Sequence, residues 1–258
     1  MNNNKNILKI LTIVLGLGLW LGSAQAEEKS TPPKSTVFKA EPGKITNLAC
    51  IGDSITAGVG ASKGSSYPDQ LGKMLGDKVV VKNFGASGST LLRKGDNPYG
   101  GAHNDFRPVS KFNPDVVIIM LGTNDTKAQN WQFKDQYEAD YIYFVKKFQE
   151  MPTKPRVYIC YPPYIAGAGK YKINETNTVA QIPMIDTVAK ETGCSIIDVH
   201  GALFKKDELI PDKVHPNTAG ATIIAKTVYK ALTGKETTLT DSELLVPTPV
   251  VQESSKSK

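Results

Sequence analysis

Residues 47–56 read NLACIGDSIT and join an apolar run to an abrupt polar turn. The run Asn47–Ile51 is nearly continuous, as is typical of parallel strands that are covered on both faces. It leads directly into Gly52, Asp53 and Ser54, so a serine hydroxyl follows the carboxyl end of the expected strand. In an open α/β sheet, that edge is where ligands bind.

Four further apolar runs have the same character and alternate with helical patterns. The expected strands are Asn47–Ile51, Val79–Asn83, Asp115–Leu121, Arg156–Tyr161 and Ser195–Val199. Between and after them, apolar residues recur at helical spacing in Tyr67–Leu75, Tyr137–Met151, Ile182–Thr192 and Thr218–Leu232. This alternation predicts a doubly wound α/β fold with a mostly parallel sheet.

The two flanks of this region differ from it in composition. The chain of 258 residues is 40% hydrophobic and 22% charged, which excludes a disordered chain, a collagen and a polytopic membrane protein. Residues 27–45 and 234–258 are rich in Lys, Glu, Ser, Thr and Pro, so we interpret them as a linker and a disordered tail. One α/β domain is expected over residues 46–233.

Residues 1–26 have the pattern of a secretory signal peptide. Lys5 and Lys9 precede the apolar run Ile10–Leu21, and an A-x-A sequence follows at residues 24–26. An uncleaved membrane anchor is the alternative, although the run is short for a span of about 20 residues. We expect cleavage after residue 26, export to the periplasm or the medium, and no stable membrane insertion of the mature chain, which would begin at Glu27.

The net charge gives little support to nucleic-acid binding. The formal charge is +6, and removal of the two lysines of the signal peptide lowers it by 2 to +4. The sequence also lacks a basic stripe interleaved with aromatic residues, so nucleic acid is not an expected partner.

The three cysteines, Cys50, Cys160 and Cys194, lie in or beside the apolar runs. Three buried unpaired thiols are favoured over one disulfide and one free cysteine, because the number is odd and the positions are apolar. Neither their spacing nor that of the three histidines suits a metal site. We expect no metal and no cofactor.

Polar residues with catalytic chemistry follow several of the expected strands. Ser54 follows the first strand, a glycine-rich turn with Gly88 follows the second, and Asn124 follows the third. Asp212 and His215 are three residues apart in a loop, so one tight turn can bring the carboxylate to Nδ1 and leave Nε2 for the serine. A nucleophile, a base, an orienting carboxylate and preorganised hydrogen-bond donors are the parts that acyl transfer needs.

With these four blocks in this order, the region from Asn47 to Leu232 resembles the SGNH (GDSL-type) hydrolases, a family of esterases and lipases. The resemblance implies a flavodoxin-like three-layer α/β/α sandwich with a five-stranded, mostly parallel sheet. It also implies a triad and an oxyanion hole. Ser54 would be the nucleophile, His215 the base and Asp212 its orienting acid; the oxyanion donors would be Ser54, Gly88 and Asn124. No G-x-S-x-G sequence is present, so an α/β-hydrolase nucleophile elbow is not expected.

Each assignment has a structural alternative. Ser54 can serve as a helix N-cap, as serine at a strand end often does. His215 can be an ordinary loop histidine, and Asp198 is a rival for the triad acid. Asp53 and Asp125 are interpreted as structural residues that orient the loops carrying the catalytic serine and asparagine.

The loops after the third and fourth strands bear on the substrate. They carry Trp131 and Tyr164, which we interpret as substrate contacts; packing is the alternative for Trp131. No long apolar lid segment is evident, and polar and aromatic loops suit a short acyl group on a polar alcohol. In these loops the chain resembles exported carbohydrate O-acetyl esterases. We expect hydrolysis of a small ester or an acetylated glycan. A lysophospholipase or thioesterase with the same triad, and a non-catalytic carbohydrate-binding homologue, are the alternatives.

Overall fold

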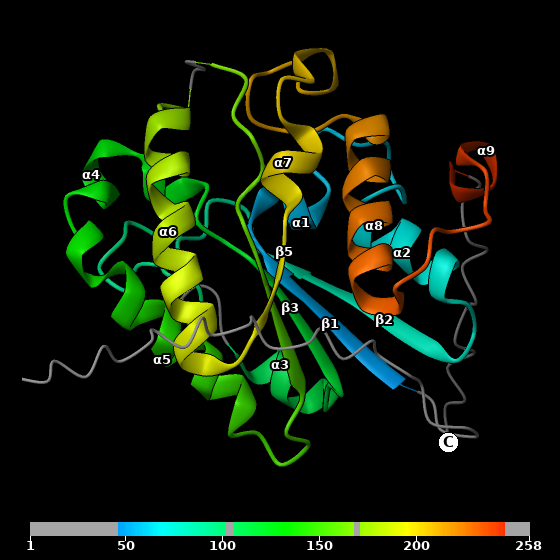
Figure 1. Ribbon diagram of the computed structural model, residues 1–258, viewed down its shortest axis with the longest axis horizontal. Helices are drawn as coiled ribbons and strands as arrows, with labels where there is room; N and C mark the ends of the chain where they lie inside the picture. Colours follow the sequence, from blue (N-terminus) through cyan, green and yellow to red (C-terminus); the bar gives the residue numbers. More distant parts are fainter. Residues whose placement is uncertain (1–45, 102–105, 168–170, 246–258) are drawn as a thin grey trace, which may run out of the picture. The chain divides into compact units, whose positions relative to one another are not determined.

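Five parallel strands form one sheet in the order β2-β1-β3-β4-β5 (Figure 1). The structure, a computed structural model, describes residues 46–101, 106–167 and 171–245. The strands are β1 (Thr46–Gly52), β2 (Val79–Gly85), β3 (Val116–Met120), β4 (Arg156–Cys160) and β5 (Ser195–Ile197). Each overlaps one of the five expected apolar runs, and β1 and β2 extend one or two residues beyond theirs. The order is that of flavodoxin-like folds, and the predicted fold class is confirmed.

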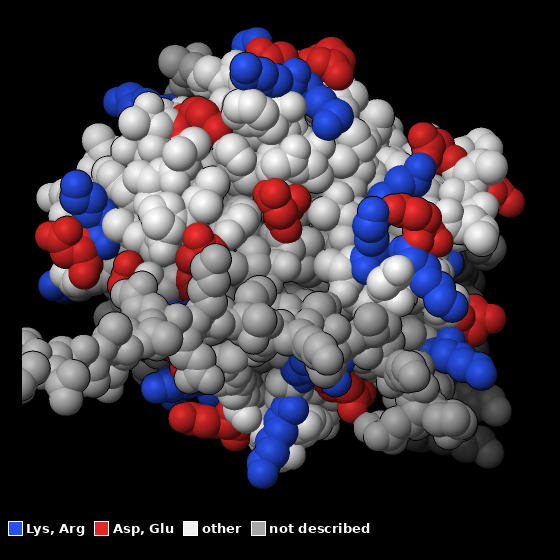
Figure 2. Space-filling view, viewed as in Figure 1, with Lys and Arg blue, Asp and Glu red and all other residues white. Residues whose placement is uncertain are grey.

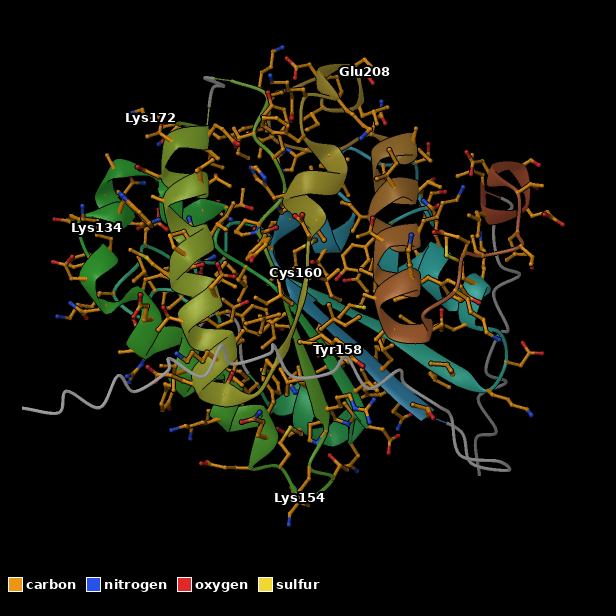
Figure 3. The ribbon with its side chains drawn as sticks, viewed as in Figure 1. Lys134, Lys154, Tyr158, Cys160, Lys172 and Glu208 are labelled. Carbon is orange, nitrogen blue, oxygen red and sulfur yellow. The ribbon has the colours of Figure 1, made fainter. Side chains whose placement is uncertain are left out.

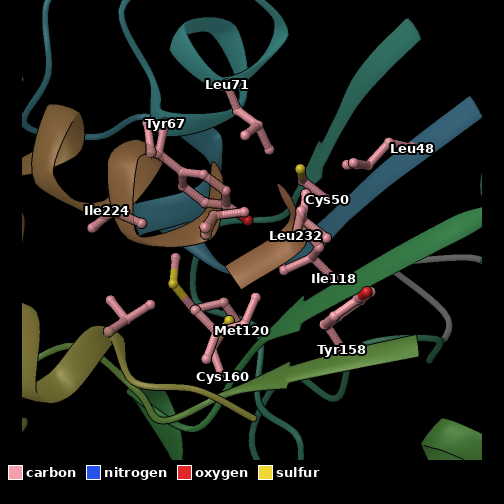
Figure 4. Packing of buried hydrophobic residues seen from close by; sticks show 14 of the residues in the cluster. Leu48, Cys50, Tyr67, Leu71, Ile118, Met120, Tyr158, Cys160, Ile224 and Leu232 are labelled. Atoms are coloured by element: carbon pink, nitrogen blue, oxygen red, sulfur yellow. The ribbon is translucent and has the colours of Figure 1, made fainter. Parts of the chain in front are cut away.

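Successive strand residues point alternately into two buried layers. Leu48 and Cys50 of β1 belong to one hydrophobic cluster, whereas Ala49 and Ile51 belong to the other. The same alternation on β3 and β4 explains why the runs are apolar without interruption. Figure 4 shows the first cluster, where the strands meet four labelled helix residues: Tyr67, Leu71, Ile224 and Leu232.

The helices cover both faces of the sheet. In the described ranges they are α1 (Ser54–Ala57), α2 (Tyr67–Leu75), α3 (Arg107–Phe112), α4 (Ala128–Trp131), α5 (Tyr137–Gln149), α6 (Glu175–Thr192), α7 (Val199–Leu203), α8 (Thr218–Thr233) and α9 (Asp241–Leu245). Three short 3₁₀ turns are η1 (Asn124–Thr126), η2 (Lys134–Gln136) and η3 (Asp207–Leu209). Helices α2 and α8 pack on the first face, and α5 and α6 on the second (Figure 1).

Local signals set the ends of two helices on the first face. Ser66 and Asp69 form a reciprocal capping box at the start of α2. The Asn217 side chain accepts the Gly220 N–H to cap α8, and Gly234 ends that helix in the left-handed conformation, with φ of 70°. The cap on α8 fixes the chain directly after the predicted Asp–His pair.

The apolar pattern predicted that this helix begins at Ile182, but α6 begins at Glu175. Asn174 caps it by accepting the Asn177 N–H at 2.9 Å. The helix continues through Pro183, which removes one internal hydrogen bond. Pro183 and Val179, whose carbonyl loses its partner, both lie on the exposed side, where water can satisfy that carbonyl.

Residues 234–245 differ from the predicted disordered tail. They lead into α9, where Leu244 is completely buried in the cluster formed with α2 and α8. Lys73 on α2 donates to the Leu244 carbonyl oxygen, and Lys226 on α8 pairs with Asp241 at 2.6 Å. The prediction was therefore wrong for this segment, because one buried leucine and two polar contacts hold a short helix whose other residues are exposed.

Other predictions concern the cysteines and the ends of the chain. The three cysteines are free and buried, as expected. The predicted signal peptide, the linker up to residue 45 and residues 246–258 lie outside the described residues. Within the described ranges, none of the helices has both the length and the apolar character that crossing a bilayer requires. On the face shown in Figure 2, Lys and Arg are interspersed with Asp and Glu.

Candidate active site

The turn from β1 into α1 places Ser54 at the carboxyl edge of the sheet. A Cβ atom on Gly52 would lie 2.0 Å from Thr56 Oγ1 and 2.7 Å from a β3 carbonyl oxygen, so only glycine lets α1 start this close to the strands. Asp53 is the N-cap of α1, since its carboxylate accepts a backbone N–H of the first turn at 2.9 Å. Ser54 is the first helical residue, and its hydroxyl is left to face His215.

A tight turn before α8 presents His215 to Ser54. One oxygen of Asp212 accepts the backbone N–H groups of Val214 and His215 at 3.0 and 2.7 Å, which fixes the turn. The other oxygen lies 2.7 Å from His215 Nδ1, and His215 Nε2 lies 2.9 Å from Ser54 Oγ. The structure thus brings the three predicted triad residues into one hydrogen-bonded row, with Ser54 and His215 both buried.

The hydrogen bonds around Asp212 favour its ionised form. Partial desolvation alone would raise the pKa of Asp212, but the hydrogen bonds from the side chain and backbone of His215 and from the Val214 N–H hold it below its usual value. An ionised Asp212 keeps the His215 proton on Nδ1, so Nε2 is free to accept the proton of the Ser54 hydroxyl.

The loops after β2 and β3 bring Gly88 and Asn124 together. The amide nitrogen of Asn124 donates to the Ser89 carbonyl oxygen at 3.1 Å and lies 3.5 Å from Asp53 Oδ2. Because Ser89 follows Gly88 directly, this hydrogen bond holds the Gly88 turn beside Asn124. Gly88 has a φ of 81°, a left-handed conformation that favours glycine. The two candidate oxyanion donors therefore lie next to the turn that carries Ser54.

Asp125 and Asn130 join the loops that carry these donors. The Asp125 carboxylate accepts the two backbone N–H groups of residues 91–92, at 3.0 and 2.7 Å. Asp125 was predicted to orient the loop that carries Asn124. In the structure, Asp125 holds the loop after β2, which carries Gly88, against the loop that carries Asn124. Asn130, which sequence analysis missed, donates to the Asn124 carbonyl oxygen at 2.9 Å from a buried position on α4.

Two carboxyl groups beside the site are completely enclosed. Burial raises the pKa of Asp53 to about 7, although the hydrogen bond from the α1 backbone lowers it, and the charge of Asp125 adds to the increase. Burial also raises the pKa of Asp125 to about 6, against the lowering effect of its two backbone hydrogen bonds. Both groups therefore bind protons more tightly in the folded protein than in the unfolded chain.

Asp53→Asn is expected to remove part of the pH dependence of stability. The folded pKa of Asp53, about 7, lies above its unfolded value, so the folded protein loses stability as the pH rises from about 4 to about 7. The asparagine side chain does not titrate in this pH range. The free energy of unfolding of the variant, relative to wild type, should therefore rise by at least about 1 kcal/mol between about pH 5 and about pH 8.

Urea denaturation at the two pH values measures this difference. Asp135→Asn, which changes an exposed carboxylate on η2, is the matched control and should follow wild type. If the free energies of unfolding of wild type and Asp53→Asn changed equally with pH, the raised pKa of Asp53 would be contradicted.

Trp131, the last residue of α4, follows β3 in the chain, and Tyr164 lies in the loop after β4. The structure gives each of them packing contacts. Trp131 packs edge-on against Tyr137, with ring centroids 6.2 Å apart. The Tyr164 ring packs against His200 and Phe204, and its hydroxyl donates to a carboxylate on η3 at 3.1 Å. Their predicted roles as substrate contacts remain predictions.

Sequence analysis singled out neither Tyr171 nor the pair formed by His200 and Glu175. The Tyr171 ring packs edge-on against the His215 ring, and His200 Nε2 lies 2.7 Å from Glu175 Oε1. No spacing pattern marks these contacts, because each joins separate segments. The rival acid Asp198 caps α7 by accepting a backbone N–H at 2.6 Å, whereas Asp212 is the partner of His215. In the described ranges, no cluster of three or more His, Cys, Asp or Glu side chains is placed to hold a metal ion.

A family model described as the GDSL-like lipase/acylhydrolase family matches residues 50–223, a span that contains the whole hydrogen-bonded row. The chain belongs to this family. The GDSL-like chain is also 34% identical, over 237 residues, to an acetylxylan esterase from Xylanibacter ruminicola. That match covers 84% of this chain and 46% of the relative, so the chain spans about half the length of that protein.

Solved structures show the same fold as the GDSL-like domain. The inhibitor-bound aryl esterase of M. smegmatis matches with a TM-score of 0.60 and 19% identity, over 72% of this chain and 97% of that one. The acetylxylan esterase Axe2 from Geobacillus stearothermophilus matches with a TM-score of 0.54 and 22% identity, over 74% and 95%. The family match places the domain among carboxylic ester hydrolases.

Proposed function

We propose that this protein is a serine ester hydrolase that removes short acyl groups, acetyl above all, from a carbohydrate or a similar polar alcohol. The observation that carries the proposal is the hydrogen-bonded row from Asp212 through His215 to Ser54. It lies where the strand order reverses between β1 and β3, the place where open α/β sheets bind ligands. The acetylxylan esterase relative supports an acetylated glycan as the substrate.

In this proposal the reaction consists of two acyl transfers. His215 Nε2 accepts the hydroxyl proton of Ser54 while Oγ attacks the ester carbonyl carbon. The backbone N–H groups of Ser54 and Gly88 and the Asn124 amide stabilise the oxyanion. The bond to the alcohol oxygen then breaks, that oxygen takes the proton from His215, and the acyl group stays on Ser54. Water gives a proton to His215 and attacks in turn, and the acid leaves as Ser54 regains its proton.

The site of action is part of the proposal. The signal-peptide pattern of residues 1–26 supports action outside the cytoplasm. Mass spectrometry of exported protein should find a mature N-terminus at Glu27, and exported protein that retains Trp20 would contradict this.

Acetyl esters are expected to exceed octanoyl esters in kcat/KM by at least about tenfold, or roughly 1.4 kcal/mol. A fully buried methylene contributes about 0.8 kcal/mol to binding. The sequence has no long apolar lid segment, so a long acyl chain is expected to gain little of this energy. A panel of chromogenic esters from acetyl to dodecanoyl, with one common alcohol, measures the preference. A preference for octanoyl or longer chains would overturn the acetyl assignment and favour a lysophospholipase or thioesterase with the same triad.

A further inference from the structure

We propose that Tyr171 forms the binding site for the alcohol half of the ester, where its ring packs against the apolar face of a pyranose. The inference rests on the proposed function, because it takes His215 as the proton donor to the leaving alcohol. In Figure 3, Lys172, the neighbour of Tyr171, lies at the carboxyl edge of the sheet together with Glu208, whereas Lys154, just before β4, lies at the opposite edge. Tyr171 contacts the His215 ring and therefore lies at the edge of the sheet that carries Ser54.

The ring of Tyr171 is in contact with the ring of His215. Their centroids are 5.3 Å apart and their planes are inclined by 85°, an edge-to-face arrangement. Tyr171 also packs on a small hydrophobic cluster that is distinct from the two layers covering the sheet: Ile165, Ile173 and Val214. These three residues are buried, whereas Tyr171 is only partly buried.

Two backbone N–H groups near the start of the loop that leads to Tyr171 make hydrogen bonds to its surroundings. The Ala166 N–H donates to the carbonyl oxygen of Lys213, in the turn between Asp212 and His215, at 3.1 Å. Glu175, the first residue of α6, accepts the Ile165 N–H at 2.9 Å with one carboxylate oxygen and contacts His200 with the other. The first part of this loop, at Ile165 and Ala166, is thus tied both to the turn that carries His215 and to the start of α6.

The chemistry of the reaction fixes which half of the substrate lies near Tyr171. The leaving oxygen must come within hydrogen-bonding distance of His215 Nε2 to receive its proton. The proposed oxyanion donors Gly88 and Asn124 lie in the loops after β2 and β3, whereas His215 lies in the turn before α8. The carbonyl oxygen and the leaving oxygen therefore face different loops. An alcohol attached to the leaving oxygen therefore passes beside the imidazole and meets the Tyr171 ring.

The size of the alcohol decides whether this contact forms. A pyranose presents a face of C–H groups that can pack on the face of an aromatic ring. Ethanol is too small to cover the ring. Tyr171 therefore acts on the choice of alcohol and leaves the choice of acyl group unchanged.

The test compares Tyr171→Leu, Tyr171→Phe and wild type on two acetyl esters, an acetylated xylo-oligosaccharide and ethyl acetate. Tyr171→Leu should lose about three- to tenfold in kcat/KM on the sugar ester, mainly through KM, because the aromatic face is removed. Tyr171→Phe keeps the ring and should stay within about twofold of wild type, and both variants should stay within about twofold on ethyl acetate. Tyr143→Leu, at an exposed tyrosine of α5, is the matched control.

The outcomes separate this inference from the proposed function. Equal losses of Tyr171→Leu on both esters would show that the ring acts only through His215, and unchanged kinetics on the sugar ester would show no contact; either result overturns the inference. A wild-type enzyme that cleaves ethyl acetate but not the sugar ester would overturn the proposed carbohydrate substrate, and this inference with it.

Discussion

Ser54→Ala is expected to reduce kcat on an activated acetyl ester by about a thousandfold or more, while the thermal unfolding midpoint stays close to that of wild type. The variant loses the hydroxyl that is expected to attack the ester and carry the acyl group. Stability should change little, because Asp53 and not Ser54 caps α1. Steady-state kinetics and a thermal melt of the same preparations measure both quantities.

Ser110→Ala is the matched control for the loss of a hydroxyl group. Ser110 is an exposed residue of α3, the helix that precedes β3 in the chain, and its hydroxyl donates within the helix to the Phe106 carbonyl oxygen. Its replacement should leave kcat unchanged. If Ser54→Ala kept half of the wild-type rate, Ser54 would not be the nucleophile.

Asp212→Asn is expected to lower kcat by about a hundredfold to ten-thousandfold. The asparagine oxygen can still accept the backbone N–H groups of Val214 and His215 that shape the turn. Its amide then places a donor opposite Nδ1 of His215. The ring is forced to carry its proton on Nε2, where it can no longer accept the proton of Ser54.

Asp198→Asn is the matched control, because Asp198, which follows β5, was the rival candidate for the triad acid. Its carboxylate caps α7, and asparagine is an equally good helix cap, so activity should be retained. If Asp198→Asn lost as much activity as Asp212→Asn, or Asp212→Asn lost none, the assignment of the acid would be wrong.

The layout of the fold was predictable because the central strands β1, β3 and β4 are covered on both faces. Such strands require near-continuous apolar runs, and these are visible without any tertiary information. The start of α6 was not predictable from apolar periodicity, since its first turns are mostly polar and a proline such as Pro183 usually lies near the end of a helix and not inside it. Helix α9 was missed because its stability depends on the insertion of Leu244 beside α2 and α8.

The candidate triad was predictable for a different reason. Asp212 and His215 are close in sequence, and Ser54 marks the end of a strand, so local spacing and topology place them together. The supporting contacts depend on tertiary structure: Asn130 meets Asn124 from α4, and Glu175 meets His200 across two helices. In the same way, Tyr171 is one of several loop aromatics, and only its contact with the His215 ring distinguishes it.

Covalent labelling with a fluorophosphonate, followed by peptide mass spectrometry, tests the central claim most directly. The reagent reacts with an activated serine hydroxyl and leaves a stable adduct in place of the acyl group. The account predicts a single adduct on the peptide that contains Ser54, matched loss of esterase activity, strongly slowed labelling of Asp212→Asn, and no labelling of Ser54→Ala. An active enzyme that remains unlabelled, or that carries its adduct on another residue, would contradict the account.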